Sequence, residues 1–293
     1  SILTALVSSG APNADIVREL RLPRVLLAFL IGGGLAVSGA ALQALVRNPL
    51  ADPYLFGISG GAGLAAVVII ALGIAGPWVV PVAAFGGGLA AVMLVYRLAS
   101  VAGRRLDPRM LVLAGVVVSS FTVAVISAVL TLSPADRLRN AMLWLLGGFS
   151  AASWQTLTVF SAYALLPAAA LFASARYLDL LSLGEEPAQS LGLDVVWARR
   201  IVFLATSLLT AASVAVCGAI GFVGLVAPHA IRGLIGPAHR RLLPGVFLAG
   251  GGFLVLADAL ARTVVRPIEL PVGAVTALVG VPIFAVLLRR TLR

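Results

Sequence analysis

Few residues in this chain are able to do covalent chemistry, and none stands in a catalytic pattern. All 21 basic residues among the 293 are arginines, which excludes a Walker A nucleotide site and Schiff-base chemistry, because both need a lysine. The single cysteine, Cys217, excludes an intrachain disulfide and any two-cysteine metal site. The sequence shows no metal-ligand cluster and no nucleophile beside a base. We therefore expect no enzyme activity and no covalently bound cofactor.

The two histidines and Asp258 have structural explanations. His229 follows Pro228 inside an apolar run, where an unpartnered imidazole is costly, and we expect it to make a structural hydrogen bond rather than to bind haem iron. His239 is expected to lie in a solvated loop. Asp258 is expected to pair with Arg262 one helical turn later rather than to relay protons.

The elements that position these residues are expected to be membrane helices. Hydrophobic residues make up 61% of the chain and charged residues 11%, whereas soluble domains carry about 25% charged residues. A helix needs roughly 20 apolar residues to cross a bilayer. The charge-free intervals predict an all-α polytopic membrane protein with about nine crossings. These lie between Arg24 and Arg47, Asp52 and Arg97 (two, divided at Gly76 and Pro77), Arg109 and Asp136, Arg139 and Arg176 (after a short surface helix around Trp144), Arg200 and Arg232 (a sixth, and a short seventh beginning at Pro228), Arg241 and Arg262, and Pro271 and Arg289.

Arginine placement predicts the orientation. With the C-terminal arginines in the cytoplasm, the cytoplasmic loops carry twice as many arginines as the other side, in agreement with the positive-inside rule. Residues 1–20 then lie in the periplasm and do not have the pattern of a signal peptide. This topology predicts one further helix before the sequence begins. Because the arginines are spread between apolar runs, we expect no nucleic-acid partner.

Several motifs stand in a fixed order along the chain. They occupy residues 21–24, 39–43, 47–53, 113–115, 144–148, 184–192, 218–229, 269–273 and 280–282. Together they resemble the permease subunits of the iron-siderophore, haem and cobalamin ABC importers (type II importers), and the resemblance extends from about Arg21 to the C-terminus. It implies one transmembrane permease domain over 1–293, in a family whose members have ten helices, so the family's first helix is expected to be missing here.

The resemblance also implies partners and a cargo. Such permeases form homodimers in the bacterial inner membrane, within the lipid bilayer, and bind two cytoplasmic ATPase subunits that supply ATP hydrolysis. A periplasmic substrate-binding protein delivers the cargo, which crosses by alternating access at the dimer interface. The outer arginines favour haem over a siderophore as the cargo, and a siderophore over cobalamin.

Residues 176–200 are expected to form the cytoplasmic coupling loop. The resemblance assigns ATPase coupling to a set of six residues within it: Gly184, Glu185, Glu186, Ala188, Leu191 and Gly192. Pro187 suits the first turn of a helix, and Gly192 suits its C-terminal cap. An ordinary solvated loop is the alternative.

Three arginines on the outer side, Arg21, Arg24 and Arg262, run against the positive-inside trend. The resemblance implies that they receive glutamates of the binding protein, because arginine binds carboxylates in a bidentate geometry. Lipid-headgroup contact or helix capping is the alternative. Arg137 and Arg139 are expected at the outer mouth, where they would meet carboxylates of the cargo or face lipid.

The resemblance places a cytoplasmic gate in two loops and the pathway on the fourth span. The gate residues are Asn48, Leu50, Asp107, Pro108 and Arg109, and the pathway residues are Leu113, Ser119, Ser120, Thr122 and Ser127. Plain turns are the alternative for the gate, and interhelical hydrogen bonds are the alternative for the pathway hydroxyls.

Two other classes of function compete with the importer. A secondary transporter usually needs buried acids at mid-membrane, and we expect none within a span because Asp258 lies near a helix end. A membrane enzyme or a structural subunit of a larger complex is the second rival, and the lack of a catalytic constellation argues against an enzyme.

Overall fold

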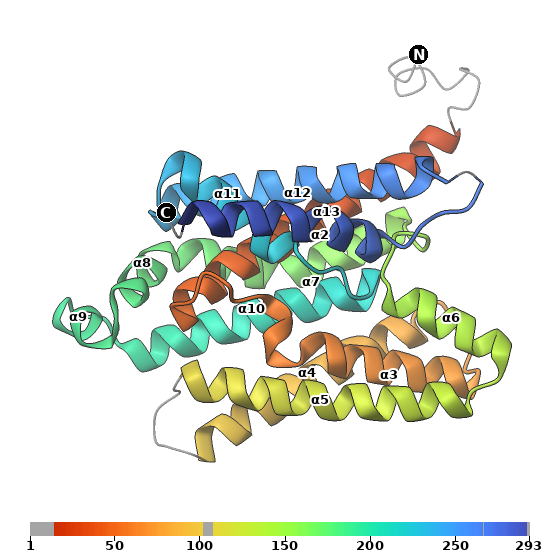
Figure 1. Cartoon of the computed structure of the whole chain (residues 1–293), viewed down its shortest axis with the longest axis horizontal. Helices are drawn as coiled ribbons and strands as arrows, with labels where there is room; N and C mark the ends of the chain where they lie inside the picture. The colour runs from red at the N-terminus through yellow and green to blue at the C-terminus, as the bar shows by residue number, and fades with distance from the viewer. Residues whose placement is uncertain (1–14, 102–107, 266, 292–293) are drawn as a thin grey trace.

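The computed structural model describes residues 15–101, 108–265 and 267–291, and within these ranges every regular element is a helix (Figure 1). The elements are η1 (Ile16–Arg21), α2 (Leu22–Val46), η2 (Pro53–Phe56), α3 (Ile58–Leu72), α4 (Val79–Val101), α5 (Pro108–Leu132), α6 (Ala135–Leu145), α7 (Trp154–Ala173), α8 (Ala175–Leu183), α9 (Glu185–Ser190), α10 (Val195–Cys217), α11 (Val223–Ile235), α12 (His239–Thr263) and α13 (Val272–Thr291).

Among the described residues, the apolar helices lie where the charge-free intervals predict them. Six are long and apolar enough to cross a membrane: η1 with α2, α4, α5, α7, α10 and α12. Three shorter apolar segments, in α3, α11 and α13, complete the set. The predicted all-α polytopic fold with about nine membrane helices is confirmed. Helix α6, which includes Trp144, is the predicted short helix before the fifth span.

Helix α11 begins earlier than predicted. We expected it to start at Pro228, but it starts at Val223 and contains Pro228 in its interior. Proline has no N–H to donate to the carbonyl four residues earlier, here that of Gly224. The Gln43 side chain of α2 donates to that carbonyl instead, at 3.4 Å. The proline is tolerated because another helix replaces the missing donor.

Helix α2 forms the centre of the molecule. In its most apolar stretch 78% of the residues are buried, against 28% for each of α4, α5 and α7. It packs against α12, α10 and α11. A side chain on Gly39 would collide with the Gly224 backbone, and one on Gly32 would collide with that of Gly250. Glycine in α2 therefore allows the close backbone approach that stabilises membrane helix pairs.

The start of α2 and the end of α12 lie at one end of the molecule, opposite to α8 and α9 (Figure 1). The first turn of α2 and the last turn of α12 share one end, where Arg24 contacts Asp258. Helices α8 and α9 lie at the other end. From the orientation predicted by arginine placement, we call the Arg24 end the outer end and the α9 end the inner end.

Candidate functional site

The inner end presents α9 as a short, capped helix. The Gly192 N–H donates to the Gln189 carbonyl at 2.9 Å, and the Leu193 N–H donates to the Ala188 carbonyl at 3.0 Å. These two bonds form a Schellman motif, with Gly192 in the left-handed conformation at φ +82°. Pro187 is the third residue of α9. The predicted helix with proline in its first turn and Gly192 as its cap is confirmed.

The predicted coupling residues do not all face outward. Ala188 is fully buried and belongs to the hydrophobic core, so it packs α9 onto the rest of the chain and does not lie on an open surface. Glu186, Leu191 and Gly192 are exposed. Gly184 is buried between α8 and α9, close to the Arg47 guanidinium.

One ion pair and one histidine–carboxylate contact attach this segment to the membrane helices. Arg199 of α10, with a side chain only 7% exposed, donates to the Glu185 carboxylate at 3.2 Å. Asp179 of α8 accepts from the His239 backbone N–H at 2.9 Å and lies 2.7 Å from the His239 Nδ1. The prediction of a solvated His239 is wrong, because its ring is buried between α8 and α12. Sequence reasoning missed this pair because its members lie 60 residues apart.

The outer end contains a network of two arginines and two acids. Arg24 donates to Asp258 at 2.9 Å and to Glu269 at 3.0 Å. Arg262 pairs with Asp258 at 3.1 Å, which confirms the predicted pair one helical turn apart. Of the three arginines predicted to dock a partner, Arg24 and Arg262 are therefore engaged within the chain, and Arg21 is exposed.

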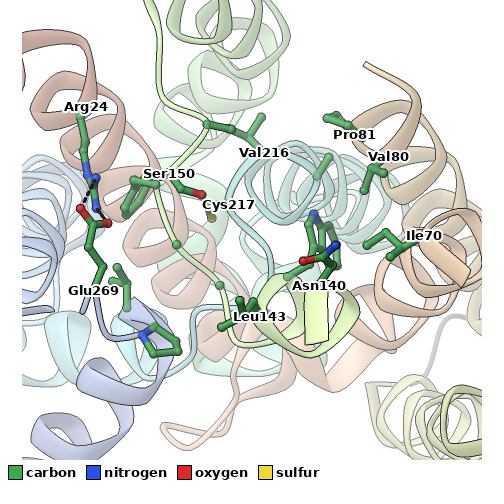
Figure 2. Close-up of a pocket in the computed structure, with 18 of the residues that line it drawn as sticks. Arg24, Ile70, Val80, Pro81, Asn140, Leu143, Ser150, Val216, Cys217 and Glu269 are labelled. Carbon is green, nitrogen blue, oxygen red and sulfur yellow. Dashed lines mark hydrogen bonds and ion pairs between the residues drawn. The ribbon is translucent and has the colours of Figure 1, made fainter. Parts of the chain in front are cut away.

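Beside this network lies a cavity of about 580 Å³. Figure 2 shows Arg24 and Glu269 together on one side and Asn140 across from them. Arg24 and Glu269 are the charged members of its lining, and most other lining residues are apolar. Arg137, predicted at the outer mouth, donates instead to the Ala71 carbonyl at 2.7 Å and so caps the end of α3. Arg139 is exposed.

The motifs in the chain interior meet at one junction. Gln43 donates to the Gly224 carbonyl and accepts a bond from Arg232 of α11 at 3.1 Å. The Tyr54 hydroxyl donates to the Ile220 carbonyl at 2.9 Å and accepts from the Ile220 N–H at 3.0 Å. These bonds satisfy both backbone groups of Ile220 between α10 and α11 and the Gly224 carbonyl in α11, as a break at membrane depth requires. One feature of the sequence indicates that the Gly224 carbonyl needs a donor from elsewhere. Pro228, four residues later, has no N–H to donate to it.

Helix α5 carries most of the predicted pathway residues on its exposed side. Leu113, Ser120 and Ser127 are exposed and Ser119 is half-buried. Thr122 differs from the prediction: it is 5% exposed, and its hydroxyl lies against Gly60 of α3. Hydroxyl character alone did not reveal which face of the helix Thr122 occupies.

Those predicted gate residues that the structure describes lie at the inner ends of α2 and α5. The Asn48 side chain accepts from the Leu50 N–H at 2.9 Å, which forms a tight turn, and Leu50 is 44% exposed. Pro108 is buried as the first residue of α5, and Arg109 is exposed. Asp107 lies outside the described residues.

Comparison with known proteins identifies close relatives. The FecCD transport family matches residues 1–290. The chain is 43% identical to YvrB, an ABC transporter permease of Bacillus subtilis, over 94% of this chain and 79% of YvrB. It is 44% identical to the haemin transport permease HmuU of Yersinia pestis, over 93% of this chain and 82% of HmuU. It is 43% identical to the cobalamin import permease BtuC of Halobacterium salinarum, over 96% of this chain and 75% of BtuC.

A solved structure has the same fold. It is described as an inward-facing conformation of a metal-chelate type ABC transporter, and it matches with a TM-score of 0.89 at 31% identity, covering 99% of this chain and 96% of its own.

Proposed function

Because the chain belongs to the FecCD transport family of ABC importer permeases in the bacterial inner membrane, we propose that it moves a large iron chelate, with haem favoured over a siderophore. Cobalamin is the alternative cargo within the same family. The relatives named for haem and for cobalamin are almost equally similar to this chain, so identity does not decide between them. Exposed Arg139 at the outer end favours a cargo that carries carboxylates, as haem does.

The importer function is supported by one observation: two polar surfaces lie at opposite ends of the molecule and are joined by continuous helices. A capped helix with exposed Glu186 and Leu191 lies at the inner end, and an arginine network lies at the outer end. Helix α12 connects them, from His239 to Arg262. A transport subunit needs such an arrangement if it receives cargo on one side of the membrane and is coupled to ATP hydrolysis on the other.

We assign a role to each surface. Coupling to a cytoplasmic ATPase is assigned to Gly184, Glu185, Glu186, Leu191 and Gly192, with Ala188 holding α9 in place from behind. The gate is assigned to Asn48, Leu50, Asp107, Pro108 and Arg109, and the pathway to Leu113, Ser119, Ser120 and Ser127 of α5. In this proposal two copies of the chain meet along the pathway, each copy binds one ATPase subunit, and a periplasmic binding protein docks outside.

Co-purification tests the class of function. The chain is expressed together with ATPase and binding-protein subunits from the same genome and purified in detergent through a tag on the permease. We expect the ATPase to remain bound, and its hydrolysis rate to rise when the loaded binding protein is added. A chain that purifies without an ATPase and transports with a proton gradient alone would instead be a secondary transporter.

The cargo is tested in proteoliposomes in which the ATPase subunits face the lumen and the lumen contains ATP. Haemin, a ferric siderophore and cyanocobalamin are each supplied with the binding protein, and ATP-dependent uptake is measured. We expect haemin uptake to exceed the other two. Cobalamin uptake without haemin uptake would contradict the proposed cargo and leave the importer function intact.

Docking on the outer arginines is tested with Arg21→Glu. We expect this variant to weaken the affinity of the binding protein and to reduce its dependence on salt, because one charge pair across the interface is lost. Arg200→Glu, an exposed residue at the inner end, serves as the matched control. An unchanged affinity and salt dependence in Arg21→Glu would refute the docking assignment.

A further inference from the structure

Glu269 differs from every other member of the outer network in its exposure. Its side chain is 51% exposed, whereas Arg262 is 27%, Arg24 is 15% and Asp258 is 2% exposed. The carboxylate of Glu269 accepts from Arg24 Nη2 at 3.0 Å and from Nη1 at 3.4 Å. It therefore covers the outer edge of the guanidinium, while Asp258 binds the Nε side of the same group at 3.2 Å.

The charges explain why Glu269 is present. Arg24 and Arg262 both contact buried Asp258, so these two arginines and one carboxylate together have a net charge of +1. Glu269 balances that charge from the solvent side. An exposed pair of this kind contributes little free energy, because water screens it and its side chains lose entropy when they are held together. The buried Arg24–Asp258 contact is the fixed part of the network, and the Glu269 contact is the exchangeable part.

We propose that Glu269 occupies the position that a carboxylate of the binding protein takes in the assembled importer. The outer edge of the Arg24 guanidinium presents two parallel N–H donors, which is the geometry that selects a carboxylate. Exposed Arg21 precedes Arg24 by three residues and lies at the same end. The surface that opens when Glu269 moves away is therefore cationic at two neighbouring points and fits an acidic face of a protein.

This proposal rests on the proposed function and adds a step to docking. An acidic partner must displace Glu269 before it binds Arg24, and Asp258 keeps Arg24 in position during the exchange. Glu269 then weakens docking, although it contacts a docking residue, Arg24. Its removal is expected to strengthen binding, which is the opposite of what loss of an ordinary contact residue would do.

The experiment compares Glu269→Gln with Glu19→Gln in the complete permease–ATPase complex, held in nanodiscs. Glu19 is an exposed acid at the same end, so its substitution removes the same charge from the outer surface. Binding of the cargo-free binding protein is measured by biolayer interferometry. We expect Glu269→Gln to bind about two- to fivefold more tightly than wild type, which corresponds to release of one exposed ion pair. Glu19→Gln is expected to have a smaller effect.

A double-mutant cycle with Arg24→Gln completes the test. In the Arg24→Gln background, Glu269→Gln should no longer change the affinity. Unchanged or weaker binding by Glu269→Gln, or an effect equal to that of Glu19→Gln, overturns the proposal even if Arg21→Glu has confirmed docking. A gain seen only with cargo-loaded binding protein also overturns it, because Arg24 would then receive a carboxylate of the cargo.

Discussion

At the scale of single residues, Gly192 combines an unusual backbone conformation with open surroundings. Its φ is +82°, and a side chain added there would meet nothing within 4 Å. We expect Gly192→Ala to destabilise the α9 cap by about 1–2 kcal/mol, because L-residues are strained in this conformation. The predicted result is a lower amount of cargo moved per ATP hydrolysed, measured in proteoliposomes. We expect Gly192→Arg to uncouple transport more strongly, because it adds bulk to the exposed face.

Gly233 provides the control for Gly192. It also has open space around it, but it lies within α11 and is not among the glycines with positive φ. Gly233→Ala should leave the ratio of transport to ATP hydrolysis unchanged. Equal transport by Gly192→Ala and wild type would contradict the role of the cap in coupling.

Gly39 is constrained by space and not by conformation. A methyl group there would overlap the Gly224 backbone, and overpacking a well-packed interior costs about 1–3 kcal/mol. We expect Gly39→Ala to lower the thermal unfolding temperature of the purified chain. Gly252→Ala, in α12 with nothing within 4 Å, should not lower it. Equal unfolding temperatures in the two variants would show that α2 and α11 can move apart without loss.

At the scale of elements, α9 depends on the helix that follows it. The substitution Arg199→Met removes the guanidinium but keeps most of the apolar stem. It breaks the hydrogen bond to Glu185. Loss of a hydrogen bond to a charged group costs about 1.5–3 kcal/mol. We expect this variant to keep its membrane expression and to lose ATPase stimulation by the binding protein. Neighbouring Arg200 is exposed, and Arg200→Met should retain stimulation. Equal stimulation in both variants would show that α9 needs no anchor on α10.

The sequence predicted the elements better than it predicted their contacts. Helix positions follow from the length of charge-free runs, since an apolar segment in a bilayer must satisfy its backbone within a helix. Local pairs such as Asp258 with Arg262 follow from helical spacing. The direction of Thr122 and Ala188 and the burial of His239 depend on neighbours distant in sequence. Spacing along one helix contains no information about those neighbours.

At the scale of the whole molecule, only 28% of the residues in the most apolar stretch of α5 are buried by its own chain, the same share as in α4 and α7. If two copies meet along this helix, a cysteine at Ser120 should crosslink to its equivalent in the other copy. The native Cys217 is buried and should react little with a bismaleimide in native membranes. We expect a crosslinked dimer for Ser120→Cys and none for Tyr163→Cys, at an exposed site on α7. The reverse result would place the dimer interface on α7.

The central position of α2 has a consequence for biosynthesis. It is the first long helix of this sequence to leave the ribosome, but it packs most closely with α12, which ends at Thr263. At a synthesis rate of roughly 5–20 residues per second, α2 waits tens of seconds for that partner. During this time its glycine-rich faces are exposed to lipid or to the insertion machinery. A chain interrupted before α12 therefore lacks the main support of its innermost helix, and quality-control proteases should recognise it as incomplete.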